Sequence, residues 1–344
     1  TEKQRKGLAD YFTPTLVKMR QETAGSDGML GGASLTDPDN YPNRAAQTGT
    51  QALTIPRAAT GGALRDGSAS SKEEVARAFA AMDALAAALG ADRCQIFTDV
   101  TGVYTADPRV VTDARQLQVI GYEEMLELAN QGAQVMQTRA VELGWVNGVT
   151  IEVLSSFVDQ PGTQIKEDVH VEQRNKVRGL AADTKVAKVT MVAVPDRPGI
   201  AKSIFDPLAA ANINVDMIVQ NVSHDGTTDL SFTCGRSDLA AARPVLEKIQ
   251  AEIGARALEI DESVAKISIV GAGIQNAPGY AARMFGTLAD AKVNIQMIST
   301  SEIRITCIVA QADADRALKA LHDTFDLATP DPVDAAARDA ESRA

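Results

Sequence analysis

The sequence predicts a short α/β unit followed by two α+β modules of one kind, behind a front segment that is largely irregular. The main observation is an internal repeat, because Val189–Gln220 is partly repeated at 267–297. A second is the alternation of helical and strand patterns between residues 71 and 154. A third is residues 1–70, which are rich in turn residues and have little apolar periodicity.

The repeat defines two modules with bounds 185–262 and 263–329, followed by a polar tail at 330–344. Each copy has a β-branched run, a Pro-Gly turn, an amphipathic helix and a second β-branched run, and two copies are too few for a solenoid. The first copy predicts βαββαβ order, and the second is expected to repeat it across 264–329. The elements expected in the first copy are strands 186–194, 213–222, 227–235 and 257–261, with helices 198–211 and 237–253.

Residues 71–170 are expected to form the α/β unit. Ser71 and Glu74 form a capping box that starts a helix, and Gly90 ends it. A strand at 94–97, helices at 122–130 and 135–143, and a strand at 149–154 follow. This alternation favours a parallel sheet of few strands. In the front segment only a helix at 14–22 is expected.

Composition argues against several classes of partner. The chain has 344 residues and a net charge of −11, so neither nucleic acid nor an anionic membrane would attract it. Its apolar runs are shorter than the roughly 20 residues that span a bilayer. The three cysteines lie in apolar, strand-like stretches, which indicates buried reduced thiols and a cytoplasmic location. The three histidines are scattered, so no metal site is expected.

The Pro-Gly turn of the first copy has the chemistry to hold a small zwitterion. After Gly199 the chain enters a helix whose first N–H groups are unpaired and attract a carboxylate. Asp196 lies one turn earlier, where it could accept an ammonium group. The alternative is that the turn merely starts a helix and that Asp196 is a solvated loop charge.

Several long motifs make residues 86–327 resemble the C-terminal part of an aspartate kinase. They include ADRCQIFTDVTGVYTADPR, YEEMLELANQGAQVMQTRAVE, PDRPGIAKSIFDPLAAANINVDMIVQN and VNIQMISTSEIR. The resemblance implies a partial amino-acid-kinase lobe and two ferredoxin-like ACT domains that bind lysine or threonine. It also implies either a homodimer through the ACT domains or pairing with a full-length catalytic aspartate kinase. The effector-binding residues that it implies are Asp196, Gly199, Ile200, Ala201, Gln220, Asn294, Ile295, Ser301 and Glu302.

The resemblance also implies ATP and Mg²⁺ as cofactors, but the kinase motif is incomplete. Residues expected along the nucleotide are Thr98, Asp99, Tyr104, Arg109 and Gln134. The Lys-x-Gly-Gly-Thr-Ser motif of the family is missing, and Gln134 stands where the family has a lysine aimed at the phosphates. Thr101 replaces the usual aspartate of the TDVDG run. An amide cannot replace an ammonium group opposite a polyanion, so no catalytic residue is assigned and an inactive lobe is expected.

Three functions therefore remain open. The first is a regulatory protein of the aspartate-kinase type that senses an amino acid, and the second is an active aspartate kinase. The third follows from residues 1–70, which weakly resemble the segment after the membrane helix in flagellar stator B proteins. That resemblance would make the chain a motor-associated or envelope-associated protein that carries the ACT pair.

Overall fold

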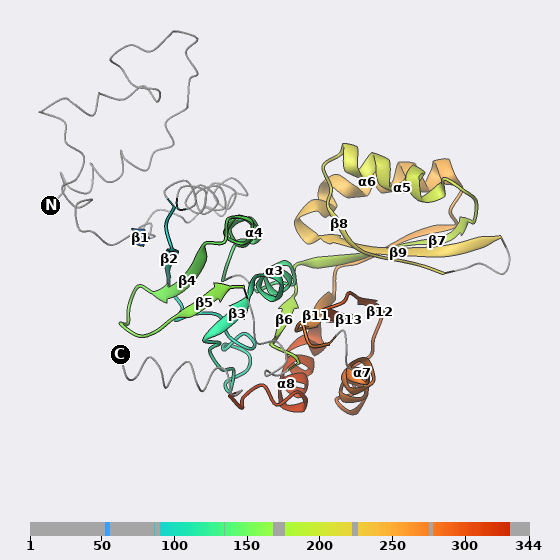
Figure 1. The fold of residues 1–344 in the computed structure, drawn as a ribbon. Coiled ribbons are helices and arrows are strands. Elements are labelled where there is room, and N and C mark those ends of the chain that lie inside the picture. Colours follow the sequence, from blue (N-terminus) through green and yellow to red (C-terminus); the bar gives the residue numbers. More distant parts are fainter. Residues whose placement is uncertain are drawn as a thin grey trace, which may run out of the picture. The chain divides into compact units, whose positions relative to one another are not determined.

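The computed structural model describes residues 52–55, 86, 90–133, 135–167, 176–221, 226–274 and 278–330 (Figure 1). The chain divides into two units, Thr1–Thr50 and Gln51–Ala344, and the first lies outside the described residues. The helix expected at 14–22 also falls outside them, as do nearly all of the helix at 71–89 and the tail after residue 330.

The α/β unit is built on a mixed sheet of five strands. Their order is β1 (Ala52–Ile55), β2 (Arg93–Thr98), β4 (Thr150–Ser155), β5 (Thr163–Lys166) and β3 (Val119–Gly121). All neighbours are parallel except β4 and β5, which pair antiparallel. The expectation of a parallel sheet was therefore wrong at that pair. β1 belongs to the front segment, where much of 25–68 was expected to be extended or disordered and no strand was assigned.

In the described part of the chain, the helices after residues 121 and 137 pack their apolar faces against this sheet. α3 spans Tyr122–Asn130, as expected, and α4 spans Thr138–Asn147, three residues later than expected at its start. α3 buries Met125 and Leu128 in a core shared with the fully buried Ile151 and Ile165 of the sheet. Burial of apolar side chains on one helical face drives this packing.

The first α+β module has the topology that the sequence predicts. Its antiparallel sheet has the order β10 (Ala257–Asp261), β7 (Val186–Pro195), β9 (Thr227–Gly235) and β8 (Val215–Gln220). Helices α5 (Ile200–Ala210) and α6 (Leu239–Ile253) pack against it, with a short 3₁₀ turn at Arg236–Asp238 before α6. Phe205 of α5 meets Phe232 of β9 edge to face, with ring centroids 5.5 Å apart.

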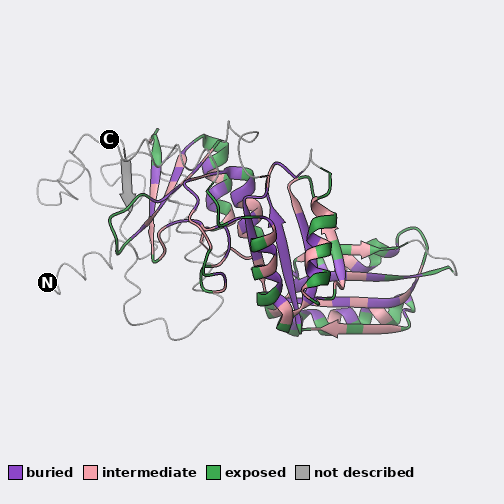
Figure 2. Cartoon of the chain, turned by 90° about the horizontal axis from the view of Figure 1, so that it is seen from below, coloured by how far each residue is buried: buried purple, intermediate pink, exposed green. Residues whose placement is uncertain are grey.

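The second module differs from the expected continuous order in one strand. Its sheet has the order β12 (Met297–Thr300), β13 (Arg304–Ala310), β11 (Val264–Val270) and β6 (Gly179–Asp183). Helices α7 (Tyr280–Asp290) and α8 (Ala314–Thr324) complete it, with a 3₁₀ turn at Gln311–Asp313. The fourth strand thus precedes the first module in the chain, although a strand after α8 was expected. All seven residues of β11 are buried (Figure 2).

A small apolar cluster joins the two modules, and it follows the repeat. Its members are Val186, Met217, Val264, Met297 and Ile308. Val186 corresponds to Val264 in the repeat, and Met217 corresponds to Met297. Each module therefore contributes a matching valine and methionine to this cluster, which we call the seam, and the second module adds Ile308. The neighbouring Ile218 and Ile298 remain 50% and 43% exposed.

The cysteines are buried and free, as the sequence predicts. Burial raises the pKa of the Cys234 thiol to about 11 and that of Cys307 to about 12. Within the described ranges no group of three or more His, Cys, Asp or Glu side chains could hold a metal ion. Across the same ranges no helix is long and apolar enough to cross a membrane.

Candidate functional site

Both modules begin their first helix with an uncapped N-terminus. Gly199 precedes α5 with φ of 91°, and Gly279 precedes α7 with φ of 100°. This left-handed backbone favours glycine, since a Cβ atom would add strain. Among the described residues, no side chain caps either helix start. The Ile200 N–H of α5 donates to the carbonyl of Arg197 at 3.2 Å, and the N–H groups that follow it at each helix start can face an anionic ligand.

In the second module the helix start opens onto a hollow of about 270 Å³. Ser301 and Glu302 lie in the turn between β12 and β13, and they line the same hollow as Gly279. The turn is closed by a hydrogen bond from the Ser301 N–H to the carbonyl of Arg304, 2.9 Å long. The complete lining is Ile274, Gly279, Tyr280, Ala281, Thr300, Ser301, Glu302 and Ile305.

The lining combines three kinds of group. The start of α7 offers backbone N–H groups and the positive end of a helix dipole. Glu302 is exposed and offers a carboxylate, and Thr300 and Ser301 offer hydroxyl groups. Ile274 and Ile305 supply apolar surface. A small zwitterion would meet a donor for its carboxylate and an acceptor for its ammonium within one hollow.

The first module places its predicted residues around the equivalent turn. Asp196 is exposed, and its N–H donates to the carbonyl of Gly226 at 2.9 Å. Ala201 is exposed at the start of α5, whereas Ile200 is buried in the module's core. Gln220 is exposed at the end of β8. The structure thus keeps the polar side chains accessible and uses Ile200 for packing.

The predicted residues of the second module divide into two places. Asn294 is exposed and Ile295 packs against the second core, and neither lines the hollow. Conversely, Tyr280 and Ala281 line it although the sequence did not single them out. The repeat itself carried that signal, because Tyr280 and Ala281 occupy the positions of Ile200 and Ala201 in the first copy.

The end of β2 and the loop after it hold four of the residues expected along a nucleotide. The Thr98 hydroxyl bonds locally to the backbone of Val100, and Asp99 is exposed. The Tyr104 hydroxyl lies 2.6 Å from that of Thr101, the residue that departs from the family pattern. Gln134 lies outside the described residues.

Arg109 is held by a neighbouring carboxylate. Its Nε lies 3.0 Å from Oδ1 of Asp107 and its Nη2 lies 2.6 Å from Oδ2. The hydrogen bond from Arg109 lowers the pKa of the Asp107 carboxyl below its usual value. The guanidinium is 87% exposed but already paired. A phosphate would have to displace Asp107 to gain the same bidentate contact.

The same loop is tied to the second module. Oγ1 of Thr105 lies 3.0 Å from Nε2 of His322 on α8, and both residues are fully buried. Thr105 also accepts a hydrogen bond from the Arg115 N–H at 2.9 Å. The loop is therefore fixed by a contact that the sequence does not reveal.

Three family models match successive parts of the chain. Residues 80–155 match the amino acid kinase family, and residues 188–251 and 267–325 each match the ACT domain. An aspartokinase from Pseudomonas aeruginosa is 49% identical over 249 residues, which are 72% of this chain and 60% of the relative. The chain thus spans about 60% of the length of the curated relatives it matches.

Solved structures show the same likeness. Escherichia coli aspartokinase III in complex with aspartate and ADP (R-state) matches with a TM-score of 0.62 and 27% identity, over 72% of this chain and 55% of the other. The same enzyme in complex with lysine and aspartate (T-state) matches with a TM-score of 0.60, at the same identity and coverage. The resemblance to aspartate kinases is confirmed, and the chain carries part of an amino-acid-kinase lobe followed by tandem ACT domains.

Proposed function

We propose that this chain is a regulatory protein of the aspartate-kinase type that binds lysine or threonine for feedback control of aspartate-derived amino-acid synthesis. The observation that carries the proposal is the hollow at the start of α7, which is lined by both the first residues of that helix and Glu302. The repeated helix start at Gly199 gives the first module a similar turn. The complex of E. coli aspartokinase III with lysine supports an amino acid as the ligand.

The kinase lobe is proposed to be inactive in this chain. Gln134 stands where the family resemblance implies a lysine aimed at the nucleotide phosphates. Arg109 is engaged by Asp107, and Tyr104 by Thr101. The Arg109 guanidinium and the Tyr104 hydroxyl therefore do not fit ATP and Mg²⁺ as they stand, because each already has a partner. Phosphoryl transfer needs positioned cations around the γ-phosphate.

Assembly through the ACT domains is part of the same proposal. Ile218 and Ile298 occupy equivalent positions on the edge strands β8 and β12, and both stay exposed beside the seam. Edge strands with exposed apolar side chains favour pairing with another chain. The partner is proposed to be a second copy or a full-length catalytic aspartate kinase. Sedimentation that shows a monomer at micromolar concentrations, alone and with a catalytic chain, would contradict this.

Calorimetry with lysine and with threonine tests the sensor function. A ligand at a hundredfold excess over its Kd should stabilise the fold by about 2.7 kcal/mol. Glu302→Gln should weaken binding by about tenfold or more, since it removes a charged acceptor for the ammonium group. Glu259→Gln, which neutralises an exposed glutamate on β10, is the matched control and should bind as the unaltered chain does. Absence of binding by both amino acids would refute the sensor function.

An assay of aspartyl hydroxamate separates the inactive lobe from an active aspartate kinase. The purified chain is incubated with aspartate, ATP and Mg²⁺, and no turnover is expected. Kinases typically turn over at about 1–100 per second. A rate in that range would refute the inactive lobe and favour the enzyme, and it would leave the calorimetric result unaffected.

A further inference from the structure

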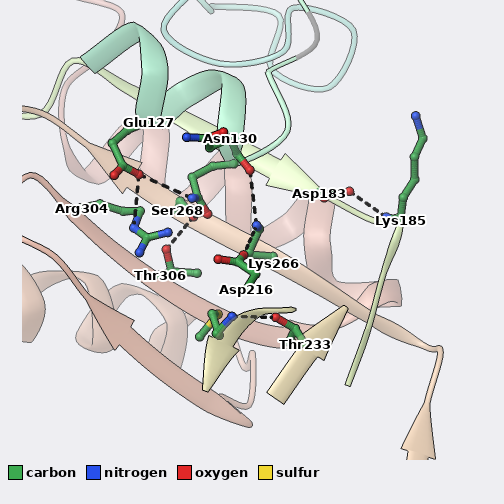
Figure 3. A network of polar contacts seen from close by, with 12 residues as sticks. Glu127, Asn130, Asp183, Lys185, Asp216, Thr233, Lys266, Ser268, Arg304 and Thr306 are labelled. Atoms are coloured by element: carbon green, nitrogen blue, oxygen red, sulfur yellow. Dashed lines mark hydrogen bonds and ion pairs between the residues drawn. The ribbon is translucent and has the colours of Figure 1, made fainter. Parts of the chain in front are cut away.

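Lys266 is a buried cation at which three parts of the chain meet. It lies on β11 of the second module, and its side chain is 4% exposed. Its Nζ is 2.6 Å from Oδ2 of Asp216, on β8 of the first module. The same Nζ is 3.5 Å from the carbonyl oxygen of Asn130, the last residue of α3 (Figure 3). One ammonium group therefore contacts both modules and the kinase lobe.

The end of α3 is electrostatically suited to this contact. Its last turn has no basic residue of its own, so the negative end of its dipole has no cation from the helix. The second module supplies two cations, Lys266 and Arg304. The Nε of Arg304 lies 3.4 Å from Oε2 of Glu127 (Figure 3). Beside them, Ser268 Oγ donates to Oε1 of Gln131 at 3.1 Å. The face of the second sheet that carries Lys266, Ser268 and Arg304 thus complements the C-terminal turn of α3 in charge.

The repeat shows that the Lys266 contact is one half of a reciprocal pair. Lys188 occupies the corresponding position in the first copy, and its Nζ donates to Oε1 of Gln296 at 2.7 Å. Gln296 in turn corresponds to Asp216. Each module therefore sends a lysine across the seam to the same position of the other module. The two halves differ in charge, because Lys266 meets a carboxylate and Lys188 meets an amide.

The charged half is the one that touches the kinase lobe. A buried ammonium group loses its hydration and needs a counter-charge, which Asp216 provides. Asp216 lies on the strand that ends at Gln220, a proposed effector residue. A change at β8 would alter the position or the charge balance of Lys266 and hence its hold on α3.

We propose that Lys266 is a shared electrostatic joint that couples the first ACT module to helix α3 of the kinase lobe. The joint itself rests on the geometry, and only its use by lysine or threonine rests on the proposed function. Its main consequence is that a substitution in the first module should loosen a helix of another domain. Among the described residues no hydrogen bond or ion pair links that helix directly to Asp216, and Lys266 bonds to both.

Hydrogen–deuterium exchange on the full chain without ligand tests the joint. Asp216→Asn and Lys266→Met should each speed exchange by about tenfold in the last turn of α3, where the Gln131 N–H bonds to the carbonyl of Glu127. In the double variant the exchange should equal that of Lys266→Met alone, because Asp216 acts through Lys266. Lys188→Met is the matched control and should leave α3 unchanged.

Three outcomes would overturn the joint. One is unchanged exchange in α3 for Asp216→Asn, and another is additive effects in the double variant. The third is an equal effect of Lys188→Met. Asp216 is 41% exposed, so its conversion to Asn should leave the chain folded, and exchange in α5 and α6 reports whether it does. If lysine and threonine fail to bind, the proposed function fails, while these ligand-free comparisons still decide the joint.

Discussion

Acidification is expected to destabilise the chain through His322, a fully buried imidazole on α8. Its Nε2 bonds to the hydroxyl of Thr105, whereas its Nδ1 is buried without a partner among the described residues. A protonated ring would carry an N–H on both nitrogens, and the one on Nδ1 would have no acceptor among the described residues. Burial lowers the pKa of His322, helped by Arg115 and opposed by the carboxylates of Asp323 and Asp113.

The sign and the limit of the effect follow from proton linkage. The unfolded imidazole titrates near 6.5, whereas the folded one has a lower pKa and stays neutral. Below pH 6.5 the unfolded chain therefore binds more protons, and stability falls as the pH falls towards the folded pKa. One group contributes a slope of at most about 1.4 kcal/mol per pH unit. For a domain of this size that corresponds to roughly 3–6 °C in Tm per pH unit.

Thermal unfolding of the unaltered chain and of His322→Gln between pH 8 and pH 5 measures this slope. Glutamine keeps a hydrogen-bonding group near Thr105 but does not titrate, so the variant should lose less stability below pH 6.5. Asp107, whose pKa lies below its ordinary 3.8, titrates outside this window. Equal pH dependence of the two proteins between pH 6.5 and pH 5 would refute the reasoning.

Three further predictions concern the modules. Gly279→Ala should lower the free energy of unfolding by about 1–2 kcal/mol and weaken amino-acid binding, because a Cβ is strained on this left-handed backbone. An unchanged Tm and an unchanged affinity would contradict this prediction. Met217→Ala and Met297→Ala should each lower the free energy of unfolding, measured in urea, by about 2–5 kcal/mol. A much smaller loss would show that the seam does not contribute to the packed core. The Cys234 and Cys307 thiols should resist a thiol reagent at pH 8 until the chain unfolds, and rapid native labelling would contradict their burial.

The sequence predicted well the elements that carry their own periodicity. The bounds of α3 and β10 match the expected ranges, since each has a clear apolar pattern and a local end signal. Four strands were missed, namely β1, β3, β5 and β6, and each is short. β3 and β5 have three and four residues, too few for an alternation to be recognised. β6 reads GLAAD, which has little strand character, and its place follows from pairing with the buried β11.

Much of the candidate site could likewise not be predicted from the sequence. Ser301 and Glu302 could be named, and the structure brings them to the start of α7. The pairing of Arg109 with Asp107 could not be predicted, because the relative position of two side chains in a loop is not set by their spacing in the sequence. The contact between Thr105 and His322 joins positions 217 residues apart, and no local pattern encodes it.

Differences between the two copies are as informative as their likeness. Positions that match, such as Met217 with Met297 and Gly199 with Gly279, perform the same task in both modules, filling the seam or starting a helix. Asp216 differs from Gln296 at one position of an otherwise reciprocal contact. A symmetric seam needs no such difference, because an amide satisfies Lys188. The carboxylate is needed where the lysine is buried and also contacts the C-terminal end of α3, so the charge asymmetry marks the module that contacts this helix.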